Sequence, residues 1–230
     1  MKEKRTFYTE AAYVIGILGL ALGTAFMERA DFGVSMVVAP AYLLHLKISQ
    51  FFPFYSFGMS EYMLQLVLLV ALTVVMKKFK KSYLFSFVTA VFYGAALDAA
   101  IFCVALVPEN GFGWRCMFYA VGMLLCAFGV ACLFRTYIAP EAYELFVKEY
   151  AAKRALPVEQ VKTAYDCCSC AVGVVMSFLF FGFGVFEGVK LGTIFCAMVN
   201  GWMIGVVGAE LEKRFDFRDA LPYRRYFEKY

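Results

Sequence analysis

The chain has 230 residues, of which 63% are hydrophobic, 19% aromatic and only 17% charged, and its formal net charge is +4. A soluble domain carries about 25% charged and about 45–50% apolar residues, so this composition excludes a soluble enzyme, a disordered chain and a disulfide scaffold. The length supplies roughly six membrane-spanning helices of about 20 residues each.

In chain order, six apolar runs alternate with short polar segments, and two other segments differ from these runs. Residues 32–46 are apolar but short and contain Pro40, which predicts a re-entrant or half-helix. Residues 136–154 are amphipathic, with Glu141, Glu144 and Lys148 on one stripe, and are expected to lie at the membrane interface. The runs that we expect to span the membrane are 11–27, 59–76, 84–107, 114–134, 164–186 and 189–209.

The positions of the basic residues set the orientation of these spans. Suppose that residues 32–46 return to the side of the membrane on which they start. All but four of the 22 Lys and Arg residues then lie on the same side of the membrane as both termini. The cluster at 77–81 would fall on the other side if 32–46 crossed the membrane. We therefore expect six spans with both termini cytoplasmic, in the cytoplasmic (inner) membrane of a bacterium. The four exceptions are Arg29, Lys47, Arg115 and Lys190.

An internal repeat is visible in the glycines of the first and fourth runs. Gly16, Gly23 and Arg29 are separated by 7 and 6 positions. The same residue types recur with the same spacing 106 positions later, at Gly122, Gly129 and Arg135. Each half continues with a non-spanning helix and two more spans, and an odd number of spans makes the repeats inverted, as in many secondary transporters. The alternative is a coincidence within glycine-rich helices.

The predicted fold is therefore an all-α membrane protein with six transmembrane helices in two three-span inverted repeats, each with a re-entrant or interfacial helix after its first span. The tail is basic and aromatic, which suits a segment lying on anionic lipid. The expected parts are a cytoplasmic N-terminus (1–10), a first repeat (11–107), a second repeat (114–209) and a cytoplasmic tail (210–230).

Three short motifs carry a family resemblance. They are Phe-Gly-Val-Ser at 32–35, Thr-Ala at 89–90 with Gly-Ala-Ala-Leu-Asp at 94–98, and Gly-Thr at 192–193 followed by Gly201 and Gly205. With these motifs the sequence resembles the YczE/YyaS/YitT family of bacterial multi-pass integral membrane proteins. The chain departs from that family after the first motif, where Met-Val-Val at 36–38 stands in place of a proline and an acidic residue. The resemblance implies a transporter-like architecture.

Polar residues within apolar runs are the candidate substrate-binding or ion-binding residues, because an ionisable group near the bilayer centre costs about 2.5–3.5 kcal/mol on insertion scales. Asp98 and Asn200 lie near the middle of the third and sixth runs, and Glu61 and Gln65 share one face of the second. Ser35 could cap a half-helix, whose N-terminus attracts anions. The alternative is that Asp98 and Asn200 only join neighbouring helices and that Glu61 and Gln65 reach the interface.

Charged residues at span ends are the candidate gating residues. Glu28 and Arg29 end the first run, and Arg135 is the repeat counterpart of Arg29. We expect Arg29 to pair with Glu61 or Glu28, and Arg135 with Asp166 or Glu141. The alternative is that these are simply charged helix ends.

The leading functional interpretation is a small secondary transporter or permease with a polar site near the midplane, where an acidic residue suits proton coupling or a cationic group on the substrate. The alternative is a non-transporting partner or regulatory subunit of a larger complex. With one histidine (His45), no nucleophile motif and no metal-ligand set, we expect no enzymatic activity, cofactor or metal site. The expected partners are the lipid bilayer and a small-molecule or ion substrate. A homodimer or a partner subunit stays open, and nucleic acid is not expected.

Overall fold

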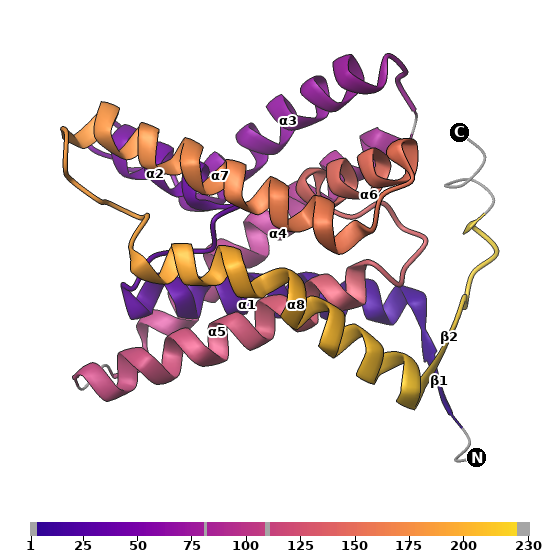
Figure 1. Cartoon of the computed structure of the whole chain (residues 1–230). Helices are drawn as coiled ribbons and strands as arrows, with labels where there is room; N and C mark the ends of the chain where they lie inside the picture. Colours follow the sequence, from indigo (N-terminus) through magenta and orange to yellow (C-terminus); the bar gives the residue numbers. More distant parts are fainter. Residues whose placement is uncertain (1–3, 81, 109–110, 225–230) are drawn as a thin grey trace.

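The computed structural model describes residues 4–80, 82–108 and 111–224. Within them the chain forms eight helices and two short strands (Figure 1). In chain order these are β1 (Arg5–Tyr8), α1 (Thr9–Ala30), α2 (Ala39–Ile48), α3 (Phe57–Met76), α4 (Ser82–Ala105), α5 (Phe112–Leu133), α6 (Ala142–Arg154), α7 (Val158–Phe181), α8 (Leu191–Arg214) and β2 (Phe215–Arg218).

Six of these helices, α1, α3, α4, α5, α7 and α8, are long and apolar enough to cross a membrane. Each has at least 20 residues, about 30 Å of helix, which matches the hydrocarbon core. The predicted all-α fold with six spans is confirmed, and the chain is a multi-pass integral membrane protein. The observed helices differ at their ends from the apolar runs: α7 begins six residues before the run 164–186 and α8 continues five residues beyond 209.

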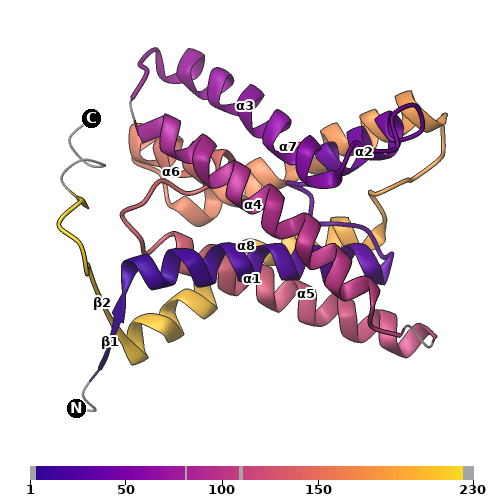
Figure 2. The same cartoon turned by 180° about the vertical axis from the view of Figure 1, so that it is seen from behind.

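The two short helices, α2 and α6, lie at opposite ends of the bundle (Figures 1 and 2). An irregular segment precedes each of them, so that α2 begins at Ala39, with Pro40 in its first turn, and α6 begins at Ala142. The interfacial position expected for 136–154 stays a prediction, but its acidic stripe is buried. Glu141 and Glu144 are only 1% and 2% exposed, because α6 packs against α3 and α7 inside the bundle.

The centre of the bundle is the crossing of α1 and α5, whose backbones touch at four glycines. A Cβ atom added to Gly16 would lie 3.0 Å from the carbonyl oxygen of Gly129, and one added to Gly122 would lie 2.7 Å from that of Gly23. The residue numbers rise along one helix as they fall along the other, so α1 and α5 cross antiparallel. Small residues permit this approach of two helices in a membrane.

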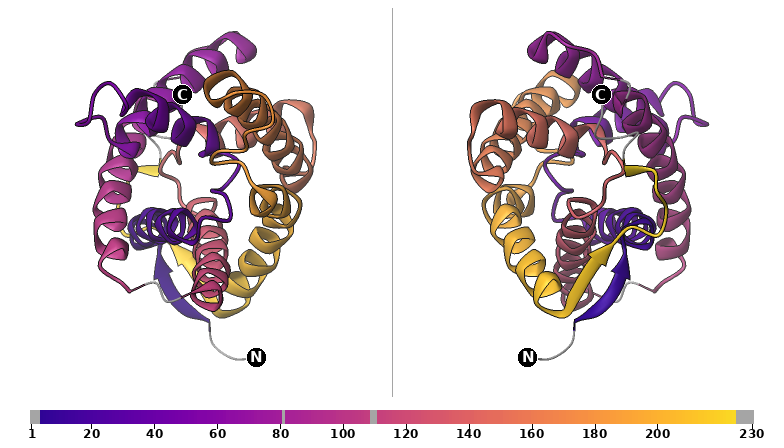
Figure 3. Two further views of the ribbon diagram at one scale, coloured as in Figure 1. Left: turned by 90° about the vertical axis from the view of Figure 1, so that its left-hand side faces the viewer. Right: turned by 90° about the vertical axis from the view of Figure 1, so that its right-hand side faces the viewer.

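The other helices continue from this pair around the bundle. α4 packs on α1, α8 packs on α5, and the pairs α3–α4 and α7–α8 complete the bundle. Seen along its length, the bundle is a ring of helices, with the connections that follow α1 and α5 passing through its middle (Figure 3).

The described ends of the chain, residues 4–8 and 215–224, lie at one end of the bundle, where β1 and β2 pair in parallel from Arg5–Phe215 to Tyr8–Arg218. We call this the terminal end. The ring of Phe7 packs between those of Phe215 and Phe217. Residues 215–218 of the predicted tail therefore form a strand, and its contact with lipid stays a prediction. Residues 1–3, 81 and 225–230, which belong to the predicted cytoplasmic segments, lie outside the described residues.

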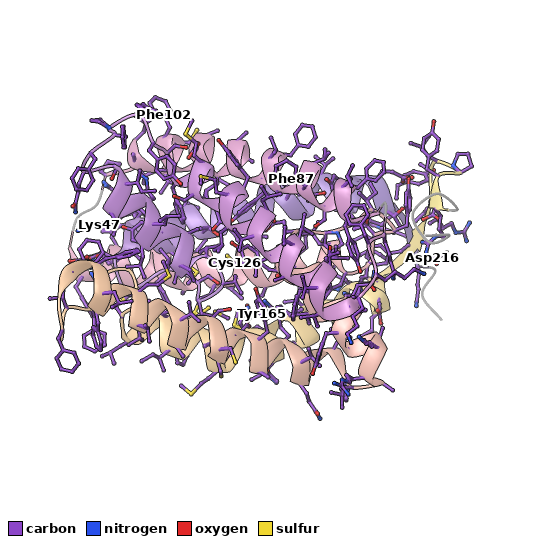
Figure 4. The ribbon with its side chains drawn as sticks, turned by 90° about the horizontal axis from the view of Figure 1, so that it is seen from above. Lys47, Phe87, Phe102, Cys126, Tyr165 and Asp216 are labelled. Atoms are coloured by element: carbon purple, nitrogen blue, oxygen red, sulfur yellow. The ribbon has the colours of Figure 1, made fainter. Side chains whose placement is uncertain are left out.

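The predicted distribution of basic residues fits this arrangement. Lys80 pairs with Glu149 of α6 near the terminal end, at 2.6 Å. Lys47 bonds the carbonyl oxygen of Phe180 at the opposite end, and Figure 4 shows Lys47 and Asp216 at the two ends of the bundle. Which end faces the cytoplasm stays a prediction.

The orientation is testable with cysteines introduced at the two ends. We expect Lys78→Cys and Arg218→Cys to be protected from an impermeant thiol reagent in intact cells and labelled after permeabilisation. Gly113→Cys, at the opposite end, should be labelled in intact cells, with the native exposed cysteines replaced in all three variants. If Lys78→Cys and Gly113→Cys are labelled from the same side, the six-span topology is wrong.

The glycine crossing predicts a position-dependent loss of stability. An alanine Cβ at position 23 would lie 2.6 Å from the Cys126 sulfur, so Gly23→Ala forces the helices apart and should cost about 1–3 kcal/mol. Gly205→Ala in α8 meets no atom within 4 Å and should leave stability unchanged or raise it by up to about 1 kcal/mol. Thermal unfolding in detergent compares them, and equal midpoints would contradict the crossing.

Candidate functional site

A group of buried polar side chains lies between α3, α6 and α7. We call it the central cluster, and none of its members is more than 2% exposed. Four of them carry carboxyl groups and one carries an ammonium group. The members are Glu61 and Gln65 of α3, Glu141 before α6, Tyr143 and Glu144 of α6, and Lys162 and Asp166 of α7.

Gln65 joins α3 to the start of α6. Its side-chain oxygen accepts the backbone N–H of Ala142 at 3.0 Å, which satisfies one of the free donors of the first turn of α6. Its amide nitrogen lies 3.3 Å from Glu141 Oε2 and 3.5 Å from Glu61 Oε2. The hydroxyl of Tyr143 donates to the same oxygen of Glu61 at 2.8 Å. Glu61 and Gln65 are one turn apart on α3, so both reach the same helix end.

Lys162 joins α7 to α6. Its Nζ lies 2.9 Å from Asp166 Oδ1, one turn further along α7, and 3.3 Å from Glu144 Oε1. Asn200 of α8 lies beside Asp166. A buried ion pair of this kind contributes little net stability, because desolvation offsets most of the attraction, but removing one partner is costly.

The cluster holds more carboxyl groups than its single cation can balance. One side-chain oxygen each of Glu61, Glu141 and Glu144 is buried without a hydrogen-bond partner. Burial, with repulsion from Glu144 and Glu61, raises the pKa of Glu141 well above its ordinary value. Glu141 therefore keeps its proton at a pH where an exposed glutamate has lost it.

A small cavity borders the cluster near the α1–α5 crossing. It leaves about 10 Å³ open to the centre of a water molecule, which is room for about one water. Cys126, near the middle of the bundle's length in Figure 4, is part of its wall. The polar members of the lining are Thr24, Ser35, Tyr93, Glu141, Tyr143, Glu144, Lys162 and Asn200.

A larger cleft of about 410 Å³ lies between α6, α7 and α8. Arg135, Lys148 and Glu212 line it towards the terminal end, and Gly201 lines it at a deeper level. Lys162 is the residue that this cleft and the central cavity share. The lysine thus separates the cavity from the cleft.

The opposite end of the cavity is covered by backbone contacts between the segment after α1 and the start of α8. The hydroxyl of Thr193 donates to the Val34 carbonyl at 2.8 Å, and the Val34 N–H donates to the Gly188 carbonyl at 3.1 Å. The Gly192 N–H donates to the carbonyl of Phe32 at 3.0 Å. The site is therefore closed towards this end.

Most of the residues predicted to bind substrate meet here. Glu61 and Gln65 belong to the cluster, and Ser35 and Asn200 line the cavity, at 5% and 6% exposure. Ser35 does not cap α2 with its side chain. Its carbonyl oxygen accepts the N–H of Ala39, which leads the chain into the helix.

Asp98 is the exception. Its carboxylate accepts the Ser56 hydroxyl at 2.6 Å and the Gly58 N–H at 2.8 Å, and Ser56 in turn caps α3 by accepting the N–H of Met59. Asp98 faces a polar partner on a neighbouring span, as the sequence suggests, but it does not line the cavity. It fixes the start of α3, one turn before Glu61.

The predicted gating residues separate into two groups. Glu141 and Asp166 belong to the cluster, whereas Glu28 and Arg29 lie side by side near the end of α1. The predicted pairing of Arg135 with Asp166 or Glu141 is wrong. Arg135 binds Glu212 at 2.9 Å, because Lys162 and Gln65 already occupy the two buried carboxyl groups.

Sequence reasoning missed Tyr93, Tyr143, Glu144 and Lys162 as site residues. Lys162 precedes the apolar run that begins at 164, and it looked like a basic loop residue on the inner side. A usable signal was present, since Lys162 and Asp166 are spaced as an i,i+4 pair at the start of a span. Within the described residues, no three His, Cys, Asp or Glu side chains are placed to hold a metal ion.

The comparison with protein families places residues 7–209 in a family of unknown function, DUF6198. The match covers most of the chain, and the protein belongs to this family. No curated protein and no solved structure matches the chain.

The role of Asp98 in holding the start of α3 predicts how its variants behave. Asp98→Leu leaves the Ser56 hydroxyl and the Gly58 N–H without their acceptor and should destabilise the protein by about 2–3 kcal/mol. Asp98→Asn keeps one acceptor oxygen and should cost about 1 kcal/mol. Unfolding midpoints in detergent measure both. Equal midpoints for wild type and Asp98→Leu would show that the carboxylate does not hold α3.

Proposed function

We propose that this protein is a small secondary transporter, that the central cluster is its substrate site, and that protons on the buried carboxyl groups couple to transport. The observation that carries the proposal is a set of unbalanced carboxyl groups, 0–2% exposed, between spans. Ionisable groups in this position are expensive, and in membrane proteins they mark substrate and proton pathways. The cavity beside them is closed, which suits an occluded state.

Contacts related by a shift of 106 residues support this proposal. α2 packs on α3 and α7, and α6 packs on α7 and α3, so each short helix contacts the second span of both halves. The glycine contacts fit the same relation, because adding 106 to Gly16 and subtracting it from Gly129 converts that pair into Gly122 and Gly23. An antiparallel crossing of this kind is what an inverted repeat with an axis in the membrane plane requires. It also agrees with the transporter-like architecture implied by the YczE/YyaS/YitT resemblance.

Two matching hydrogen bonds, which we call latches, support alternating access. Near one end, Thr193 of α8 donates to the carbonyl of Val34, and near the other, Ser86 of α4 donates to that of Pro140 at 2.6 Å. Val34 and Pro140 are 106 residues apart, and each latch joins the segment after a first span to the third span of the other half. Opening one latch would admit solvent from one end only, so we assign the gates to these latches.

The alternative, a non-transporting partner or regulatory subunit, is favoured by the near absence of free space in the cavity. It predicts a rigid bundle in which the two latches are independent. The two proposals therefore differ in whether the ends of the bundle are coupled.

Hydrogen–deuterium exchange tests this coupling without knowledge of the substrate. Thr193→Val removes the latch on Val34 and should raise amide exchange in residues 31–38 by about two- to tenfold, as loss of one hydrogen bond allows. If opening at one end requires closure at the other, exchange around 138–141 should fall in the same variant, and Ser86→Ala should produce the reverse.

Thr73→Val is the matched control, since the Thr73 hydroxyl bonds only the Leu69 carbonyl of its own helix, at 2.8 Å. It should alter neither segment. If each latch variant raises exchange at its own end and leaves the other end unchanged, transport by alternating access is contradicted. A non-transporting partner or regulatory subunit is then favoured.

A further inference from the structure

The central cluster contains two kinds of carboxyl group. Glu144 and Asp166 share the ammonium group of Lys162. Glu61 and Glu141 have no cation of their own and are linked only by the amide of Gln65. Each keeps one buried oxygen without a hydrogen-bond partner. A buried acceptor without a donor is costly. Glu144 also has a buried oxygen of this kind, but Lys162 balances its charge, so the oxygens of Glu61 and Glu141 are the ones that lack a cation.

The resident lysine shows which ligand chemistry this environment accepts. Its side chain is 2% exposed and its ammonium nitrogen lies 2.9 and 3.3 Å from two carboxylates, so the bundle holds a buried alkylammonium between acidic side chains. The second pair offers the same acceptors without the tethered cation. A free cation with N–H donors would satisfy them as Lys162 satisfies the first pair.

Aromatic surface lies beside Glu141, which lines the cavity, whereas Glu61 does not line it. Tyr93 of α4 and Tyr143 of α6 are fully buried, and both line the cavity. Tyrosine rings attract organic cations through their π-electrons, and this attraction strengthens when the cation is desolvated. An inorganic divalent cation would need several oxygen ligands around one point. The described residues offer no such group of three acidic, His or Cys side chains.

We propose that Glu61 and Glu141 form the binding site for a small organic cation, one with a protonated amine or a guanidinium group. This inference rests on the proposed function and names the class of its substrate. The cation enters when a latch opens, its N–H groups donate to the free oxygens of the two carboxyl groups, and the tyrosines enclose it.

Charge balance requires that a proton leaves when the cation arrives. In the empty protein burial and the neighbouring carboxyl groups raise the pKa of Glu141, which favours its protonated form. Binding replaces the proton on the carboxyl oxygen with the cation, and the proton passes to solvent. The titratable and charged groups that face this pair are Tyr13, Tyr93, Cys126, Tyr143, Glu144 and Lys162.

The sign of the pH dependence follows from this exchange. Below the pKa of Glu141, a bound proton must be displaced for each cation bound, so affinity should rise about tenfold for each unit by which pH rises. The dependence should flatten once the pair is ionised without ligand. An anionic or neutral ligand would show no such gain in affinity.

Isothermal titration calorimetry of the full-length protein in detergent tests the proposal, with methylammonium, guanidinium and tetramethylammonium as probes and sodium, potassium and acetate for comparison. Buffers of different ionisation enthalpy report the number of protons released. We expect methylammonium or guanidinium to bind with release of about one proton near neutral pH. Binding of sodium or potassium alone, binding of acetate alone, binding without proton release, or no binding from pH 6 to 9 would each overturn the inference.

Glu61→Gln and Glu141→Gln keep the size of the side chain and remove its charge. Each should weaken cation binding at least tenfold, and Glu141→Gln should also abolish proton release. Glu149→Gln, on α6 but paired with Lys80 outside the cluster, should bind as wild type does. Unchanged binding in both cluster variants would overturn the assignment. If a variant fails to fold, the dependence of affinity on pH in the wild-type protein tests the assignment instead.

The outcomes also separate this inference from the proposed function. If exchange at the two latches is coupled but no organic cation binds, the proposal of transport stands and the proposed substrate class is rejected. Cation binding with proton release but uncoupled latches would retain the binding site and reject alternating access.

Discussion

The backbones of α1 and α5 touch at glycines, and the positions of the other helices depend on this contact. With side chains at Gly23 and Gly122 the two helices could not approach, since an added Cβ would fall 2.6–2.7 Å from atoms of the facing helix. Close backbone contact leaves α4 to pack on α1 and α8 on α5, and these flanking helices hold α3, α6 and α7 around one central space. In a bilayer, where lipid is as apolar as leucine, such packing replaces the hydrophobic effect as the force that associates helices.

The central cluster lies against these helices, and burying it lowers the stability of the bundle. Burying Glu61, Glu141, Glu144 and Asp166 with one lysine costs stability that hydrogen bonds from Gln65 and Tyr143 only partly offset. An apolar core of the same size would be more stable, so the cluster has a physical rationale only if these groups act on something. Protonation of Glu141 lowers the cost in the empty state and leaves the site ready to exchange a proton for another positive charge.

The sequence predicts the parts of this structure that depend on local composition. The six spans follow from apolar runs of sufficient length, and the shared face of Glu61 and Gln65 follows from their spacing of four.

The remaining features depend on contacts between distant residues. Asp98 looked like a midplane substrate residue because its partner Ser56 lies 42 positions away, and an acid that caps a helix cannot be told by sequence from one that binds substrate. Lys162 looked like a loop residue because burial by α6 is a tertiary effect. The pairing of β1 with β2 joins residues 210 apart, and two four-residue strands give no pattern that predicts it.

The central claim is that the buried cluster is reached by solvent from alternate ends of the bundle. Cys126 lines the cavity, so a variant that keeps Cys126 as its one cysteine reports solvent access to the site. In sealed vesicles of either orientation, a small charged thiol reagent should label Cys126 from both sides, and Thr193→Val should speed labelling from the end opposite the chain termini and slow it from the terminal end. Labelling that occurs only after the protein is unfolded, from either side, would contradict the account.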